Sequence, residues 1–77
     1  MHFEVVGELA LIETIAHSGA IRDVARLRKL YRAKWWSKKK GFGLVRLSTG
    51  SVRRAELHWY EAHGVGRVEM KIKELLP

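Results

Sequence analysis

A chain of 77 residues buries only about 60% of its unfolded surface, so we expect one domain over residues 1–77 and no deep enzyme pocket. The absence of cysteine excludes disulfides and thiolate metal ligands, and it favours a reducing cytosolic location. The net charge is +7, and residues 22–54 hold twelve Lys or Arg against one Asp. This indicates a polyanionic partner, the alternative being a basic surface that only keeps the protein soluble.

We expect no secretion signal, because Met1 to Glu4 contain no basic segment that leads into an apolar core. No apolar run approaches the roughly 18 residues of a membrane-spanning helix. The basic run also lacks the apolar face with exposed aromatics that a membrane-surface helix needs. We therefore expect a cytoplasmic protein with no membrane partner and no cofactor.

Residues 3–16 predict a short strand followed by a short helix. The strand covers residues 3–6 and stops at a glycine. After it, Leu9, Ile12 and Ala16 have the spacing of a helix, although the β-branched residues of this stretch also fit a strand. We favour the helix.

A second helix is predicted from Ala20 to about Arg32, with Ser18 as its N-cap. Its apolar stripe consists of Ile21, Val24, Leu27 and Tyr31. A basic ridge is predicted on the opposite side, formed by Arg22, Arg26 and Lys29. The ridge is either a surface that follows phosphates or a solvated face.

The most concentrated basic and aromatic segment follows this helix and contains Trp35, Trp36, Lys38, Lys39 and Lys40. Two adjacent indoles in an extended chain cannot both face one core, so one of them is expected to be exposed. An exposed indole beside lysines could stack on an unpaired base while the ammonium groups meet phosphates. The alternative is that one indole fills the seam between the helix and the sheet.

The rest of the chain predicts three strands. Residues 41–47 form the first, and a turn at Gly50 leads into a long second strand that begins at Val52. A third strand follows the glycine-bracketed turn at Gly64 and ends near Lys73.

Alternation along these strands separates an apolar face from a polar one. The predicted apolar face consists of Val45, Leu47, Ala55, Leu57, Trp59, Val68, Met70 and Ile72. The predicted polar face consists of Arg46, Arg54, Glu56, His58, Tyr60, Arg67, Glu69, Lys71 and Lys73. We expect the helix to cover the apolar face.

The predicted fold is therefore α+β and two-layered, in the order β-(α)-α-β-β-β. An antiparallel meander is covered by a helix on one face, and its other face is bare.

The run from Arg54 to Lys73 resembles a group of small uncharacterised bacterial proteins. It reads Arg-Ala-Glu-Leu-His-Trp-Tyr-Glu-Ala-His-Gly-Val-Gly-Arg, followed after three residues by Lys-Ile-Lys. Ile21-Arg22 and Arg28-Lys-Leu-Tyr31 extend this resemblance upstream. This resemblance does not imply any particular activity.

In its element order the chain is also similar to the RelE/ParE toxin fold, part of a wider ribonuclease class that includes barnase. This resemblance implies a toxin-type endoribonuclease with an antitoxin as partner. RelE-type toxins use cations and often a tyrosine on the open sheet face, a pattern that would be met here by Arg46, Arg54, Arg67, Lys71 and Tyr60. Barnase-like members use a Glu and His pair, which would be Glu56 and His58.

The polar face also has the residue types for metal-free RNA cleavage. Glu56 and His58 lie two apart on one strand, so their side chains start about 7 Å apart on one face and could flank a phosphate as base and acid. Arg67 and Lys71 would hold that phosphate, and Tyr60 could stack or donate. The alternative is that the acids form cross-strand ion pairs and that His58 is an ordinary surface residue.

No metal site is expected. His58, Glu61 and His63 are the only clustered metal-ligand types, but strand alternation spreads them over both faces and no fourth ligand is apparent.

The sequence therefore favours a small basic protein directed at nucleic acid, RNA rather than DNA, acting as a metal-independent endoribonuclease from the open face. Its rivals are a non-catalytic nucleic-acid-binding module and a small inhibitor or assembly protein with an acidic protein partner. A second copy of the chain could complete the site. The expected binding residues are Arg22, Arg26, Lys29, Trp35, Trp36, Lys38, Lys39, Lys40, Arg46 and Arg54.

Overall fold

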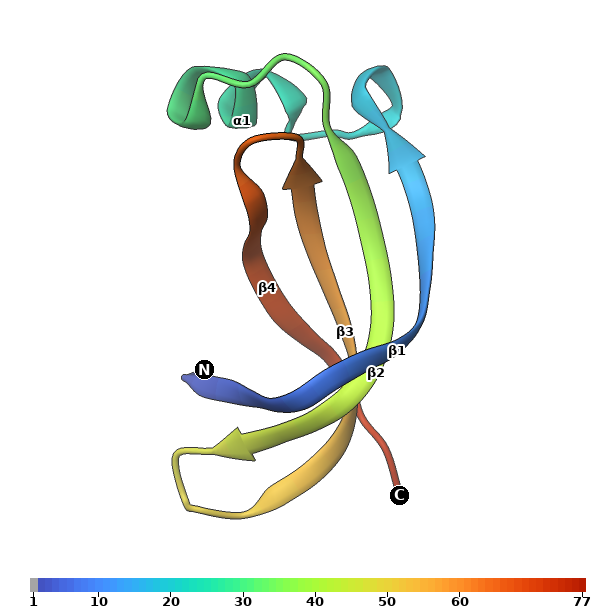
Figure 1. Ribbon diagram of the computed structural model, residues 1–77, viewed down its shortest axis with the longest axis vertical. Coiled ribbons are helices and arrows are strands. Elements are labelled where there is room, and N and C mark those ends of the chain that lie inside the picture. The colour runs from blue at the N-terminus through green and yellow to red at the C-terminus, as the bar shows by residue number, and fades with distance from the viewer. Residues whose placement is uncertain (1) are drawn as a thin grey trace.

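The protein is a four-stranded antiparallel sheet with one short helix at its end (Figure 1). The computed structural model describes residues 2–77. The strands pair in chain order, so the sheet is a simple meander. Its elements are β1 (Phe3–His17), η1 (Ser18–Ala20), α1 (Val24–Tyr31), β2 (Ser37–Leu47), β3 (Val52–Ala62) and β4 (Gly66–Leu75).

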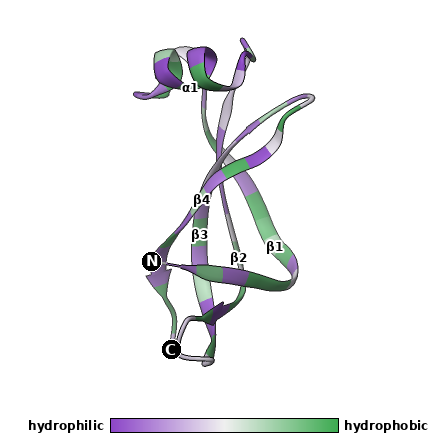
Figure 2. Cartoon of the chain, turned by 90° about the vertical axis from the view of Figure 1, so that its left-hand side faces the viewer, coloured by the Kyte–Doolittle hydropathy of each residue, from purple (hydrophilic) through white to green (hydrophobic). Residues whose placement is uncertain are grey.

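The predicted helix over residues 8–16 is wrong, because this stretch continues β1. The strand pairs with β2 from Phe3 opposite Leu47 to His17 opposite Ser37. Hydrophobic residues recur along β1 as they do along the other strands (Figure 2). Irregularities interrupt the pairing, and Leu11 has a φ of 53°. Each irregularity shifts the alternation of side chains, which explains why the sequence pattern had no clean period of two.

The expected α+β fold with a covering helix is therefore also wrong: the protein is a small β-rich fold, and it is not RelE-like. The helix begins at Val24 rather than Ala20 and ends at Tyr31, and the C-cap residue Arg32 adopts a left-handed φ of 57°. Ser18 lies in the 3-10 turn and does not cap α1. Within residues 2–77, no helix is long and apolar enough to cross a membrane.

The main core lies on the inner face of the sheet, which we define by Val45, Ala55, Leu57 and Trp59. All four are buried, Trp59 with 1% of its surface exposed. The sheet curls, and the N-terminal half of β1 turns across it (Figure 1). This brings Phe3, Val5 and Leu9 against the cluster, so the sheet folds on itself instead of using the helix as its second layer.

Two glycines on β2 make this close approach possible. A Cβ at Gly41 would lie 3.0 Å from Cη2 of Trp59 and 3.3 Å from the carbonyl oxygen of Ala10. A Cβ at Gly43 would lie 2.7 Å from Cδ2 of Leu9. The space that side chains would occupy at these positions is filled by the large residues of β1 and β3.

A second core joins α1 to the outer face of the sheet, which we define by Lys40, Glu56, His58 and Tyr60. Its buried residues are Ile21, Leu27, Trp36 and Ala62, with Tyr60 and Val68 packed against them. The helix therefore covers the opposite face from the one predicted, and only the end of it. Figures 1 and 2 both show α1 at one end of the sheet.

Gly41→Ala should destabilise the protein by about 1–2 kcal/mol, because the added methyl group meets a buried indole and a backbone oxygen. Gly19→Ala is the control: its Cβ would meet nothing within 4 Å, so stability should change by less than about 0.5 kcal/mol. Urea denaturation of both variants measures the difference. Equal stability of the two would contradict the close packing of β1 on β2.

Candidate nucleic-acid interface

Glu56 and His58 lie side by side on the outer face of β3, as strand alternation predicts. Oε2 of Glu56 is 2.7 Å from Nε2 of His58, and the two side chains are 21% and 13% exposed. The hydrogen bond with His58 lowers the pKa of Glu56, and the charges of Lys40 and Lys73 act in the same direction. Because they bind each other directly, the acid and the imidazole form one unit and do not flank a space for a phosphate.

Four lysines surround this pair, and we call Lys38, Lys40, Lys71 and Lys73 the lysine cluster. Lys40 on β2 and Lys71 on β4 are the register partners of His58, one on each side. Nζ of Lys40 lies 3.0 Å from Glu13, and this hydrogen bond raises the pKa of Lys40. No carboxylate of residues 2–77 lies within ion-pair distance of the other three lysines.

A small hollow of about 130 Å³ lies beside the lysine cluster, just below the helix. Lys38, His58 and Lys71 line it, together with Tyr60 from the outer face. On the side of the helix it is lined by two acids and a guanidinium that bind one another: Asp23, Glu69 and Arg26. Lys73 was not among the sequence-predicted site residues, although its alternation with Lys71 was a usable signal. The structure thus brings together four of the five predicted catalytic residues: Glu56, His58, Tyr60 and Lys71.

Arg67 is the fifth, and it lies on the inner face, away from His58. It is the register partner of Glu61, and its guanidinium lies 5.2 Å from the ring centroid of Trp59. The cause is a bulge at Glu69, which has a φ of 54°. The bulge inserts one extra residue between Val68 and Lys71, so both face outward while Arg67 faces inward.

Lys39 shares the inner face with Arg67, and both bind Glu61. Nζ of Lys39 lies 3.0 Å from this carboxylate and Nε of Arg67 lies 3.5 Å from it. The indole nitrogen of Trp59 donates to Glu61 over 3.1 Å. The bonds from Trp59 and Lys39 lower the pKa of Glu61, against the effect of its partial burial. Lys39 is therefore held in an ion pair on the inner face and does not belong to the lysine cluster.

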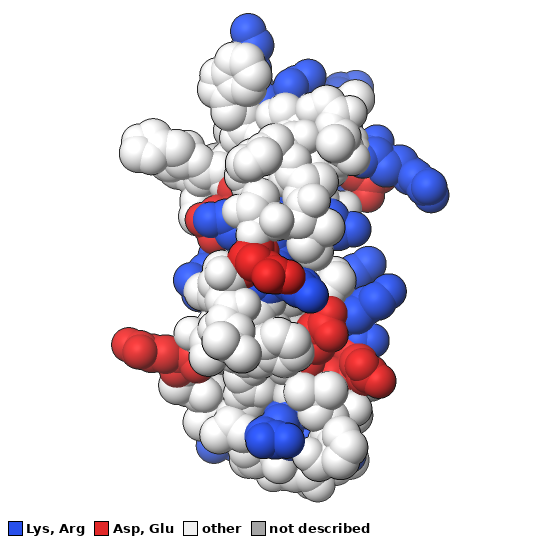
Figure 3. Space-filling view, turned by 90° about the vertical axis from the view of Figure 1, so that its right-hand side faces the viewer, with Lys and Arg blue, Asp and Glu red and all other residues white. Residues whose placement is uncertain are grey.

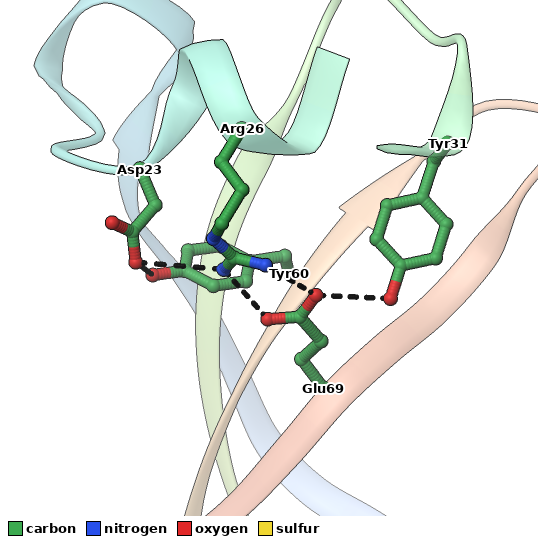
Figure 4. A network of polar contacts seen from close by, with 5 residues as sticks. All are labelled: Asp23, Arg26, Tyr31, Tyr60 and Glu69. Carbon is green, nitrogen blue, oxygen red and sulfur yellow. Dashed lines mark hydrogen bonds and ion pairs between the residues drawn. The ribbon is translucent and has the colours of Figure 1, made fainter. Parts of the chain in front are cut away.

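Tyr60 and Arg26 take part in a network that fastens α1 to the sheet (Figure 4). Arg26 donates two hydrogen bonds to Glu69, of 3.0 and 2.8 Å, and Tyr31 donates one of 2.9 Å. The bond from Arg26 lowers the pKa of Glu69, and burial raises the pKa of Tyr60. The Tyr60 hydroxyl donates to Asp23 over 3.3 Å, so neither Tyr60 nor Arg26 offers its polar group freely to a ligand.

The two adjacent tryptophans have opposite environments, as the sequence predicts. Trp36 is buried under α1, and its indole nitrogen donates to the Ala33 carbonyl over 2.8 Å. It is therefore not available to stack on a base. Trp35 is 71% exposed, with Nζ of Lys34 lying 5.2 Å from its ring centroid.

The remaining predicted binding residues do not form one basic surface. Arg46 pairs with Glu4, and Arg54 donates to the Pro77 carbonyl over 3.1 Å. Arg22 precedes α1 and Lys29 is exposed on it, while Arg26 is held by Glu69, so the predicted ridge is not continuous. Figure 3 shows Lys and Arg interspersed with Asp and Glu on the side that it presents.

Two further findings limit what the site can be. Within residues 2–77, no three His, Asp or Glu side chains gather in a way that could hold a metal ion. No protein-family model, curated protein or solved structure matches this chain.

Glu69→Gln should lower the melting temperature by a few degrees at neutral pH, because the amide replaces the carboxylate that binds Arg26 and Tyr31. The pKa of Glu69 is lowered in the folded protein, so its contribution is present above the ordinary value of 4.5. It is lost as the pH falls through the folded value. Thermal melts over this range should show the two proteins converging in acid.

Glu74→Gln is the matched control, because it removes the same charge from an exposed position of β4 that makes no ion pair among the described residues. Equal melting temperatures of the two variants at neutral pH would contradict the anchoring role of Glu69.

Proposed function

We propose that the protein binds single-stranded RNA on the outer face of its sheet, through the lysine cluster. The observation that supports this most strongly is that Lys38, Lys71 and Lys73 stand around His58 without a carboxylate partner in residues 2–77. The four ammonium groups outnumber the carboxylates of Glu13 and Glu56 that lie among them, and this excess of positive charge favours an anionic ligand.

The arrangement of the cluster suits a phosphate. Neighbouring strands lie about 4.8 Å apart, and Lys40 and Lys71 flank His58 on the two strands beside it. A phosphate above His58 would therefore meet ammonium groups from both sides. Nδ1 of His58, the ring nitrogen that Glu56 does not bind, can donate a hydrogen bond to it when the ring is protonated. The helix covers only the end of this face, so an extended strand has access to it.

A single strand is favoured over a duplex for two reasons. The cations form a small cluster among paired charges, whereas a duplex needs a continuous basic surface. The exposed Trp35 offers a ring on which an unpaired base can stack.

The Glu56–His58 pair supports a second candidate function, metal-independent RNA cleavage. Glu56 would hold the ring while His58 accepts the proton of a 2′-hydroxyl, and the lysine cluster would stabilise the extra charge on the phosphate. Once protonated, His58 can return the proton to the leaving 5′-oxygen. In this mechanism Glu56 orients His58 and does not itself transfer a proton. The sequence had instead predicted that Glu56 and His58 act as a separate base and acid.

The double variant Lys38→Ala, Lys71→Ala should bind a labelled oligouridylate at least about tenfold more weakly than wild type at low salt. The slope of log affinity against log salt concentration should also be shallower, by about 0.7 for each phosphate contact removed. Fluorescence anisotropy between about 50 and 200 mM salt measures both quantities.

The matched control is Arg22→Ala, Lys29→Ala, which removes the same charge near and on the helix. If both double variants lose the same affinity, binding is a general effect of net charge and the outer face is not the site. Binding that is insensitive to salt would instead favour a protein partner. A DNA strand of the same length tests the preference for RNA.

His58→Ala should abolish cleavage, by roughly 10²–10⁴-fold, if the pair is catalytic, and it should leave most of the binding intact. Glu56→Gln should reduce cleavage less, since it keeps the size of the side chain that orients the ring. Gel analysis of labelled RNA with purified protein gives both rates. Intact RNA after incubation with wild type would exclude catalysis by the protein alone and would leave the binding function standing.

A further inference from the structure

A larger hollow, of about 800 Å³, lies where three distant segments meet at one end of the sheet. The segments are the end of β1, the residues that lead into β2, and the turn between β3 and β4. The side chains that matter are His17, Trp35, Ser37, Glu61, His63 and Arg67. No single stretch of sequence contains this group, so only the fold reveals it.

The indole of Trp35 forms one wall of the hollow. An indole that is 71% exposed leaves a large apolar surface in water, which is uncommon for tryptophan. Lys34 lies over the ring, but it lines a second hollow and not this one. Trp35 borders both hollows, so its ring can be reached from the large hollow as well as from the side of Lys34.

The same hollow has hydrogen-bond donors and positive charge. Arg67 is 47% exposed and uses only its Nε atom, at 3.5 Å, on Glu61. Lys39 also binds this carboxylate, from outside the hollow, and the two terminal nitrogens of Arg67 have no carboxylate partner among residues 2–77. His63 is exposed at the turn, and Nδ1 of His17 lies 3.4 Å from the Ser37 hydroxyl.

We propose that this hollow binds one nucleotide unit, with the base stacked on the free face of Trp35 and the phosphate held by Arg67 and His63. A flat ring with an anionic group is the ligand that an exposed indole beside a guanidinium recognises best. The unit can be a free nucleotide or an unpaired nucleotide of an RNA strand. Binding of an unpaired nucleotide of an RNA strand rests on the proposed function. In that case the hollow would bind a base of the same strand whose phosphates the lysine cluster binds.

The first test uses uridine monophosphate and the intrinsic fluorescence of the protein. Trp36 and Trp59 are 2% and 1% exposed, so quenching by an added nucleotide reports on Trp35. We expect saturable quenching by uridine monophosphate and none by ribose phosphate, which lacks the base. Equal quenching by both compounds would overturn base stacking on Trp35.

The second test compares an oligouridylate with an abasic strand of the same length. Trp35→Ala should weaken binding of the base-bearing strand at least about fivefold and leave the abasic strand unchanged, whereas Trp35→Phe should keep most of the affinity. Trp35 is exposed, so both variants should fold, and their melting temperatures verify this. Equal affinities of wild type and Trp35→Ala for the base-bearing strand would refute the strand as the source.

The two tests separate this inference from the proposed function. Loss of affinity for both strands in Lys38→Ala, Lys71→Ala, with no effect of Trp35→Ala, would support the lysine cluster alone. Binding of uridine monophosphate without any binding of RNA would support the hollow as a free-nucleotide site and overturn the proposed function. Arg67→Lys keeps the charge but not the planar donors, and it should weaken uridine monophosphate binding several-fold.

Discussion

The burial of Trp59 against the crossing β1 strand is the constraint on which the rest of the structure depends. A four-stranded meander with a flat inner face would leave this indole in water. Gly41 and Gly43 allow β1 to approach, and Leu9 and Trp59 fill the space that they leave. Because the curled sheet buries its own inner face, the helix is not needed there and packs on the end of the other face. The helix consequently leaves most of the length of the outer face uncovered.

A single bulge then decides which charges share a face. Without the extra residue at Glu69, Arg67 and Lys71 would point to the same side of the sheet, as regular alternation predicts. With it, Lys71 joins His58 on the outer face, and Arg67 joins Trp59 and Glu61 on the inner one. The bulged residue itself turns toward α1 and binds Arg26 and Tyr31. One local irregularity thus divides the cations between two hollows and also fastens the helix.

The sequence predicted those parts of the protein in which local chemistry and global packing agree. The existence of the three C-terminal strands, the turns at Gly50 and Gly64, and the shared face of Glu56 and His58 follow from alternation and turn residues. The start of β2 does not: the strand begins at Ser37 rather than at residue 41, so the three consecutive lysines lie within it. The opposite environments of Trp35 and Trp36 also follow, since adjacent side chains of an extended chain point apart.

The parts that could not be predicted depend on irregular backbone or distant partners. Bends and register shifts hide the period of two in β1, so its apolar residues imitate a helix. The position of Arg67 depends on a positive φ at a glutamate, which no sequence pattern marks. The large hollow is assembled from three segments that meet only after the sheet has formed.

The loops that connect the four strands of the meander differ greatly in length. The turns that join β2 to β3 and β3 to β4 span only residues 48–51 and 63–65, whereas β1 meets β2 across residues 18–36. Closing the longer loop costs more chain entropy, although the cost rises only slowly with length. The N-terminal strand, which completes the shelter of Trp59, therefore bears the largest entropic penalty of assembly, and its tightly packed side chains are what offset it.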